Sequence, residues 1–208
     1  MSAATRVPDP ARRNRRSHRA ILDATFDLVA RKGYAKVTIE GIAAAAKVGK
    51  PTIYRWWPSK GALALDAVID RIGHALDFPD TGDITADLVQ QITEVVTLFS
   101  SDVGVLLRGV IAEGQSDPDV AAAVRDRFIE PRIRACRQRL DTAVTAGQLR
   151  AGVPTRSMVE SLYGAVYYRL LLGTDALTAA DVPAMVDNVI TGLAPRPARN
   201  GAPGPSAD

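Results

Sequence analysis

The stretch that decides the fold runs from Thr38 to Lys60 and reads TIEGIAAAAKVGKPTIYRWWPSK. Thr38 is a favoured helix-capping residue, and the apolar residues after it predict a first helix over residues 39–46. Residues 47–49 form a turn, and a second helix over residues 50–57 starts with a proline in its first turn, where the missing N–H costs nothing. Two short helices joined by a tight turn predict a helix-turn-helix whose second helix suits the major groove of DNA.

The second helix of this pair carries the side chains that would meet DNA. Arg55 can make a bidentate pair with guanine, and Lys50 can reach either a base edge or a phosphate. Thr52 can contact a thymine methyl group, while Tyr54 and Trp56 offer donors to phosphate oxygens. A plain amphipathic helix pair with a solvated basic face is the simpler alternative, but the turn, its apolar plug and the charges occur together. The residues predicted to contact DNA are Lys50, Pro51, Thr52, Tyr54, Arg55, Trp56 and Lys60.

Charge is distributed unevenly along the 208 residues. Residues 1–60 hold 13 Lys and Arg against 4 Asp and Glu, whereas the other 148 residues hold 13 against 19. A basic end on an acidic body is typical of nucleic-acid binding confined to one part of a chain. Residues 1–14 are expected to be a disordered basic arm, which either follows DNA phosphates or is only a solvated tail. A membrane-surface role is less favoured, because no basic helix with a bulky apolar face occurs there.

Several classes of function lack the residues that they need. The single cysteine, Cys136, excludes an internal disulfide and a cysteine-rich metal site. With only two histidines, His18 and His74, no nucleophile with its base and no metal cluster can be assembled. We therefore expect no enzyme, no metal and no cofactor. The basic N-terminus and the lack of an apolar run of ~18 residues predict a cytoplasmic protein with no membrane partner.

Apolar residues recur at helical spacing through the rest of the chain, and no alternating strand pattern interrupts them. This pattern predicts an all-α fold. A three-helix, helix-turn-helix DNA-binding domain over residues 15–60 precedes a helical body over residues 61–194 and a disordered tail over residues 195–208. Besides the helix-turn-helix pair, helices are predicted over residues 15–32, 59–76, 84–99, 103–112, 117–146, 156–172 and 181–193.

Two features of residues 117–146 give further expectations. Asp117 followed by a proline is a strong helix start, and Pro131 should kink or break this helix in its middle. The arginines at positions 132, 134, 137 and 139 are expected on solvated or interface faces. They are not expected to form a second nucleic-acid site.

The segment Ile21–Val68, ILDATFDLVARKGYAKVTIEGIAAAAKVGKPTIYRWWPSKGALALDAV, resembles the tetracycline-repressor (TetR) family of bacterial transcriptional regulators. Its ending IYRWWPSK is the most specific part. The phrases DPDVAAAVRDRFIEPR from Asp117 and VYYRLLLG from Val166 resemble a regulatory domain common in that family. The resemblance implies a homodimer in which each head reads half of a near-palindromic operator in double-stranded DNA.

By motif position, the resemblance also assigns roles within the head. It places Thr38 on a phosphate at the start of its helix. It implies base or near-base contacts for Lys50, Pro51, Thr52 and Tyr54, and backbone contacts for Arg55, Trp56 and Lys60. Two departures leave the operator sequence open. Gly49 stands where the family usually has Ser or Thr, and Pro51 stands where Gly or Ala is frequent.

For the body, the resemblance implies a dimer interface formed by the last two helices and an apolar pocket for an unknown small-molecule effector. Arg169, a charge among apolar residues, is expected to meet either an acidic ligand or Asp175. A ligand-released repressor is therefore the favoured function, and a DNA-binding regulator without a small-molecule ligand, controlled by abundance or a protein partner, is the alternative. The residues expected to line the pocket, each of which also fits plain core packing, are Phe99, Leu106, Val110, Phe128, Tyr163 and Tyr167.

Overall fold

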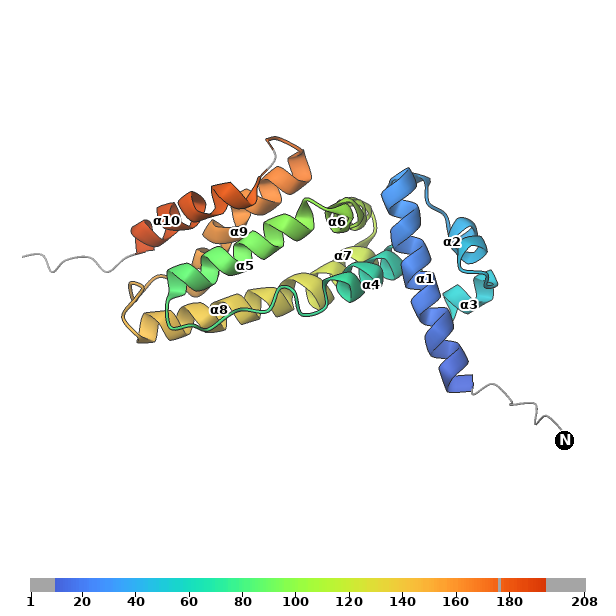
Figure 1. Ribbon diagram of the computed structural model, residues 1–208, viewed down its shortest axis with the longest axis horizontal. Coiled ribbons are helices and arrows are strands. Elements are labelled where there is room, and N and C mark those ends of the chain that lie inside the picture. The colour runs from blue at the N-terminus through green and yellow to red at the C-terminus, as the bar shows by residue number, and fades with distance from the viewer. Residues whose placement is uncertain (1–9, 176, 194–208) are drawn as a thin grey trace, which may run out of the picture.

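The computed structural model describes residues 10–175 and 177–193, and every regular element in this part is helical, so the all-α prediction is confirmed. A head stands across one end of an elongated body (Figure 1). The head consists of α1 (Pro10–Lys32), η1 (Tyr34–Lys36), α2 (Ile39–Ala45) and α3 (Lys50–Tyr54). The body consists of α4 (Lys60–Ile72), α5 (Ile84–Phe99), α6 (Asp102–Gly114), α7 (Pro118–Val124), η2 (Arg125–Ile129), α8 (Glu130–Thr145), α9 (Thr155–Leu172), η3 (Ala179–Asp181) and α10 (Val182–Leu193).

Local signals account for most helix boundaries. The side chains of Ser59, Asp83 and Asp117 each accept a hydrogen bond from a backbone N–H in the first turn of the helix that follows. The prediction that residues 10–14 are disordered is wrong, because α1 begins at Pro10, a residue suited to the first helical position. Residues 1–9 and the predicted tail lie outside the described residues.

Helix α4 joins the head to the body through one continuous hydrophobic core. It packs against both α1 and α6, and Ile21 of α1, Leu65 of α4 and Leu107 of α6 are completely buried. The position of the head is therefore set by packing against the body as well as by the covalent connection through α4. None of the described helices is by itself long and apolar enough to cross a membrane, although α5 and α6, bent by 79°, reach that length and composition together.

Pro131 does not break the helix that contains it. The chain passes from α7 through the π-helical segment η2 directly into α8, and the Glu130 N–H bonds to the carbonyl of Arg125. Proline lacks an N–H and collides with the carbonyl four residues earlier in a regular helix. The wider i to i+5 turn just before Pro131 absorbs that conflict, so the helix continues.

The expectation of a solvated or interface position is wrong for Arg139, which is only 5% exposed. Its Nε donates to Oδ2 of the completely buried Asp87 at 2.7 Å and lies 3.4 Å from Asp80. Burial alone would raise the pKa of Asp87, but hydrogen bonds from Thr81 and Arg139 outweigh it and hold the pKa below its usual value. This ion pair fixes the loop before α5 onto α8.

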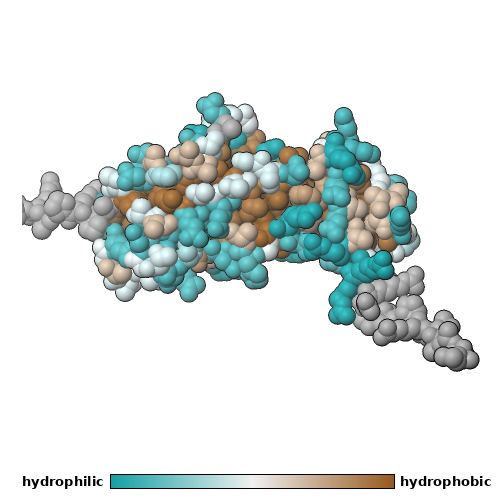
Figure 2. Space-filling model, in the orientation of Figure 1, coloured by the Kyte–Doolittle hydropathy of each residue, from teal (hydrophilic) through white to brown (hydrophobic). Residues whose placement is uncertain are grey.

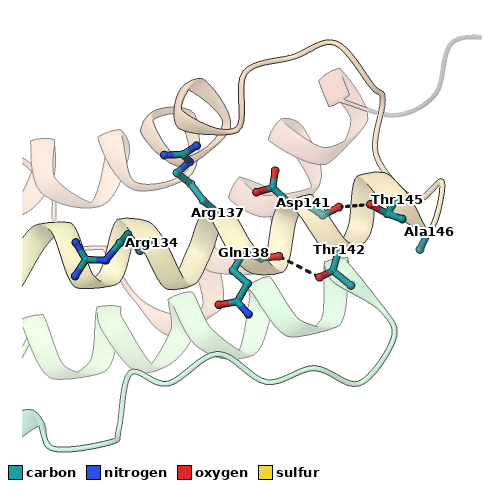
Figure 3. Close-up of a pocket in the computed structure, with 7 residues that line it drawn as sticks. All are labelled: Arg134, Arg137, Gln138, Asp141, Thr142, Thr145 and Ala146. Atoms are coloured by element: carbon teal, nitrogen blue, oxygen red, sulfur yellow. Dashed lines mark hydrogen bonds between the residues drawn. The ribbon is translucent and has the colours of Figure 1, made fainter.

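The arginines at positions 134 and 137 are exposed, as predicted. They border a shallow hollow on the outer face of α8, where the hydroxyls of Thr142 and Thr145 bond back to carbonyls of their own helix (Figure 3). All the residues around this hollow belong to α8 or directly follow it. It has no wall from a second element, so it is a surface groove and no enclosed ligand site.

Replacing Arg139 by methionine is expected to lower the free energy of unfolding by about 3 kcal/mol, because Asp87 would stay buried without its charged partner. Urea denaturation followed by circular dichroism measures this change. The matched control is Arg137→Met, an exposed arginine on the same helix, which should change stability by no more than about 0.5 kcal/mol. Equal, small effects of both substitutions would contradict a stabilising role for the buried pair.

Candidate nucleic-acid interface and ligand cavity

The helix-turn-helix is built by local contacts that the sequence predicted. The hydroxyl of Thr38 accepts the Gly41 N–H at 3.1 Å and so caps α2. The turn is closed by a hydrogen bond from the Val48 N–H to the carbonyl of Ala43. Ile53 of α3 is completely buried, so the opposite face of this helix is turned toward solvent.

Most of the predicted DNA contacts lie on that outer surface. Tyr54 is 52% exposed, and α3 ends there, so Arg55 and Trp56 fall in the turn that follows. The Lys50 ammonium lies 3.1 Å from a Glu40 carboxylate oxygen, which links α3 to α2. A bond from its own backbone N–H and the contact with Lys50 lower the pKa of Glu40. The residues that the structure places together on the outer surface are Thr38, Lys50, Pro51, Tyr54 and Arg55, with Thr52 half-buried beside them.

Trp56 was expected to face outward, but it is half-buried. Its ring lies 4.8 Å from the His18 ring and 5.5 Å from the Trp57 ring, measured between centroids. The Arg55 guanidinium lies 5.2 Å from its centroid. Trp56 therefore anchors the end of α3 to α1. Sequence reasoning missed His18 as its partner, since nothing local joins the two residues.

Lys60 is held at the head–body junction, away from the outer surface of α3. Its ammonium lies 4.2 Å from the centroid of the Tyr34 ring and 3.6 Å from Oε2 of Glu113, and its side chain is 25% exposed. The Tyr34 hydroxyl donates to the same oxygen at 2.7 Å, and burial together with this bond raises the pKa of Tyr34. A Cβ at Gly109 would come within 2.2 Å of the Tyr34 ring, so glycine is required there. This arrangement makes Lys60 a junction residue in the DNA-free structure.

The head combines this outer surface with a basic first helix, and Figure 2 shows hydrophilic residues along the length of α1. Arg15 and Arg16 are exposed. Arg19 instead pairs with Asp70 of α4 at 2.9 Å, so part of the basic cluster joins the head to the body. Arg55 Nη2 lies 3.5 Å from Oδ1 of Asn14. The exposed charges that remain on α1 and α3 can meet a polyanion.

The body contains a largely apolar cavity of about 360 Å³ between α5, α8 and α9. Three of the predicted pocket residues line it, namely Phe99, Tyr163 and Tyr167, and the Phe99 and Tyr167 rings meet edge to face at 5.7 Å. The other residues that line it are Leu76, Gln91, Val95, Ile129, Arg132, Ile133, Val159, Glu160 and Gly164.

The other three predicted pocket residues do not line this cavity. Leu106, Val110 and Phe128 are completely buried in the core. Leu106 and Val110 belong to α6, which packs against α4 and α7, so neighbouring helices cover its apolar face. Phe128 lies beneath Arg132, whose guanidinium is 3.9 Å from its ring centroid.

Sequence reasoning also missed three polar residues of the cavity wall, namely Gln91, Arg132 and the exposed Glu160. The Tyr163 hydroxyl donates to Gln91 Oε1, and burial raises the pKa of this tyrosine well above its usual value. The signal for Gln91 was present, because it follows Leu88 by three residues and so lies on the apolar face of α5. Arg132 is one of several arginines in α8, and no local pattern distinguishes it from the others.

A helix-turn-helix head joined through one helix to a helical body with a largely apolar cavity is typical of a DNA-binding regulator. The family model described as "Bacterial regulatory proteins, tetR family" matches residues 21–67, and the one described as "Tetracyclin repressor-like, C-terminal domain" matches residues 78–189. The chain belongs to the tetracycline-repressor (TetR) family of bacterial transcriptional regulators.

Individual relatives agree with this assignment. The uncharacterized HTH-type transcriptional regulator YdeS of Bacillus subtilis (strain 168) is 34% identical over 181 residues, which cover 87% of this chain and 91% of that protein. The DNA-binding transcriptional repressor TetR of Mycobacteroides abscessus is 27% identical over 175 residues, covering 82% and 90%. The crystal structure of the TetR family transcription regulator SCO0332 is similar with a TM-score of 0.72 and 37% identity, covering 86% of this chain and 99% of that one. Regulators of this family bind DNA operators and act as dimers.

Replacing Glu40 by glutamine is expected to raise DNA affinity by about two- to fivefold, because the change frees Lys50 and removes a negative charge beside the phosphates. Fluorescence anisotropy on a fixed duplex measures the effect. Asp141→Asn makes the same change of charge on the exposed face of α8 and should leave affinity unaltered. Reduced binding by Glu40→Gln would show that the Glu40–Lys50 pair instead orders α3 for DNA.

Proposed function

We propose that this chain is a transcriptional repressor that binds a near-palindromic operator as a homodimer and is released by a small molecule in the body cavity. The observation that carries the proposal is the exposed face of α3, which presents Lys50, Pro51 and Tyr54 together beside the basic helix α1. Lys50 and Tyr54 would meet base edges or nearby backbone, while Arg55 and the capped start of α2 at Thr38 would meet phosphates. The lack of an apolar spanning helix in the described chain agrees with action on DNA in the cytoplasm.

The dimer is proposed to form through α9 and α10, which lie on one side of the body (Figure 1). Tyr168 and Leu172 of α9 are 58% and 63% exposed, although both are large and apolar. The same face of α9 carries the small exposed residues Ser161 and Ala165, which allow another helix to approach closely. Large exposed apolar side chains in a group indicate an interface. Pairing these helices with their mates would set the distance between the two heads.

Release is proposed to travel through Asp66 of α4. Its Oδ2 accepts the Trp57 Nε1–H at 2.7 Å, and its Oδ1 pairs with Arg127 of η2. Two residues after Arg127, Ile129 lines the cavity, as does Arg132. A ligand that binds better when this stretch has moved would therefore favour a different position of α4 and of the head. Half-sites ~34–36 Å apart would then no longer match the two recognition helices.

Fluorescence anisotropy on DNA from upstream of the protein's own gene, at several salt concentrations, tests this function. We expect tight binding to that duplex over an unrelated one. A Lys50→Ala, Tyr54→Ala double variant should lose at least about tenfold in affinity, and the slope of log K against log salt should fall by about 0.9 for each phosphate contact removed. Arg134→Ala on the body is the matched control. Absence of binding to any duplex at low salt would overturn DNA recognition by this face.

The alternative is a regulator without a small-molecule ligand, controlled by abundance or a protein partner. Experiments on the same purified protein distinguish the two. A broad screen for compounds that raise the melting temperature and also release DNA would support the effector. Release from DNA by a purified protein partner in the absence of any compound would favour the alternative. The cavity of about 360 Å³ between α5, α8 and α9 is the observation that favours the effector.

Replacing Asp66 by alanine is expected to lower DNA affinity by about tenfold, because the buried Trp57 N–H loses its acceptor and the end of the recognition unit loosens. Asp66→Asn keeps an oxygen acceptor for Trp57 and loses only the charge that pairs with Arg127, so its affinity should stay close to that of the wild type. Anisotropy measures both, and circular dichroism confirms that each variant folds. Identical losses in the two variants would point to the ion pair rather than the Trp57 bond.

A further inference from the structure

Arg132 occupies an unusual electrostatic position in the cavity wall. It is the one cation among the described residues that line the cavity. Its Nη1 donates to the carbonyl of Phe128 at 2.7 Å, and the central carbon of its guanidinium lies 3.9 Å from the centroid of the Phe128 ring. Its Nε is buried and has no hydrogen-bond partner. A guanidinium has five donors, and a buried one without a partner costs free energy.

The carboxylates nearby are committed to other partners. Glu160, the one acid among the described lining residues, lies 3.1 Å from Arg156 and its side chain is 63% exposed. Across the neighbouring groove, Asp77 contacts His74 at 3.0 Å and Asp80 contacts Arg139. Within the described chain, no carboxylate oxygen lies within 4 Å of the Arg132 guanidinium. Asp77 attracts it only at longer range.

Arg139 supplies an internal comparison, since it lies seven residues further along the same helix. There Nε meets the buried Asp87 at 2.7 Å, and although Nη2 is also buried without a hydrogen bond of its own, it lies 2.5 Å from the same carboxylate, so the charge is balanced within the fold. At Arg132, burial lowers the pKa of the guanidinium, as expected for a cation that has lost water without gaining a close counter-ion. Arg132 lines both the apolar cavity and the adjoining groove that holds Asp77 and Asp80, and no carboxylate of the described chain pairs with it at close range.

The rest of the cavity is suited to an apolar body of modest size. Phe99 and Tyr167 meet edge to face on one side, and Val95, Ile133 and Val159 add aliphatic surface. Burial raises the pKa of Tyr167 to about 12, against the opposing charge of Arg132, so its hydroxyl stays protonated and able to donate. A volume of about 360 Å³ is near the lower end of the range for ligand pockets, about 300–1,000 Å³.

We propose that the effector is a small apolar carboxylic acid, whose carboxylate binds Arg132 while its hydrocarbon body fills the space between α5, α8 and α9. The identification as effector rests on the repressor function proposed above. A single guanidinium matches a monoanion, and its fork fits the two oxygens of a carboxylate. A dianionic phosphate would need further cations, and the described cavity lining offers none.

Isothermal titration calorimetry on the full chain without DNA tests the proposal, with acids and their primary amides as matched probes. The panel is octanoate, decanoate, 4-phenylbutyrate and 2-naphthoate, each beside its amide, at a pH where the acids are ionised. We expect at least one acid to bind about tenfold or more tightly than its amide. Arg132→Met should abolish that preference, and Arg132→Lys should retain part of it. Arg134→Met, an exposed arginine on the same helix, is the control and should behave as the wild type.

Circular dichroism melts of each variant show whether it folds, and the comparison of acid with amide within the wild type does not depend on any variant. Equal affinities for acids and amides, a preference that persists in Arg132→Met, or no binding by any acid in the panel would each overturn the proposal. Anisotropy with the upstream duplex is then run separately. An acid that needs Arg132 to bind but leaves DNA binding unchanged would keep the site and reject the effector role. Failure of the ligand-free protein to bind the upstream duplex would reject the repressor function, while the calorimetry would still test the acid site.

Discussion

The carboxylate of Asp66 is the contact on which the proposed coupling between the head and the body depends. It accepts the Trp57 indole N–H from the end of the recognition unit and pairs with Arg127, a residue 61 positions further along the chain. The Tyr34 hydroxyl bond to Glu113 makes a second link of the same kind, across 79 positions. Because these partners come from separate elements packed on α4 and α6, the head cannot turn without disturbing the body. In the proposed mechanism, these contacts would carry a change in the body to the orientation of the head.

Features governed by neighbouring residues could be predicted from the sequence. The capping hydroxyl of Thr38 and the helix start at Asp117 each act within three residues, and both are present in the structure. Val48, the apolar residue of the turn, packs partly buried against the core. The helical spacing of apolar residues likewise gave the order and approximate bounds of the body helices. The outward face of α3 followed directly, since burial of Ile53 leaves only the opposite side free.

Features governed by distant partners could not be predicted in this way. Arg139 belongs to an exposed-looking run of arginines, and only the fold brings the buried Asp87, 52 positions away, beside it. Lys60 has the right position in the motif for a phosphate contact, yet Glu113 and the Tyr34 ring hold its ammonium at the junction. Leu106 was as apolar as the true cavity residues, and the packing of α6 between two helices decided that it would be core.

Two arginines on one helix show how the same side chain takes different roles in one fold. The charge of Arg139 is balanced by the buried carboxylate of Asp87, so removing either group would destabilise the folded state. Arg132 has no such partner within the described chain, and the stretch that carries it also carries Arg127, which holds Asp66. If Arg132 gains its counter-charge from an acidic ligand, as proposed, the affinity for that ligand would depend on the position of this stretch. By linkage, a ligand bound as proposed would shift the position of the stretch, and through Asp66 that of the head as well.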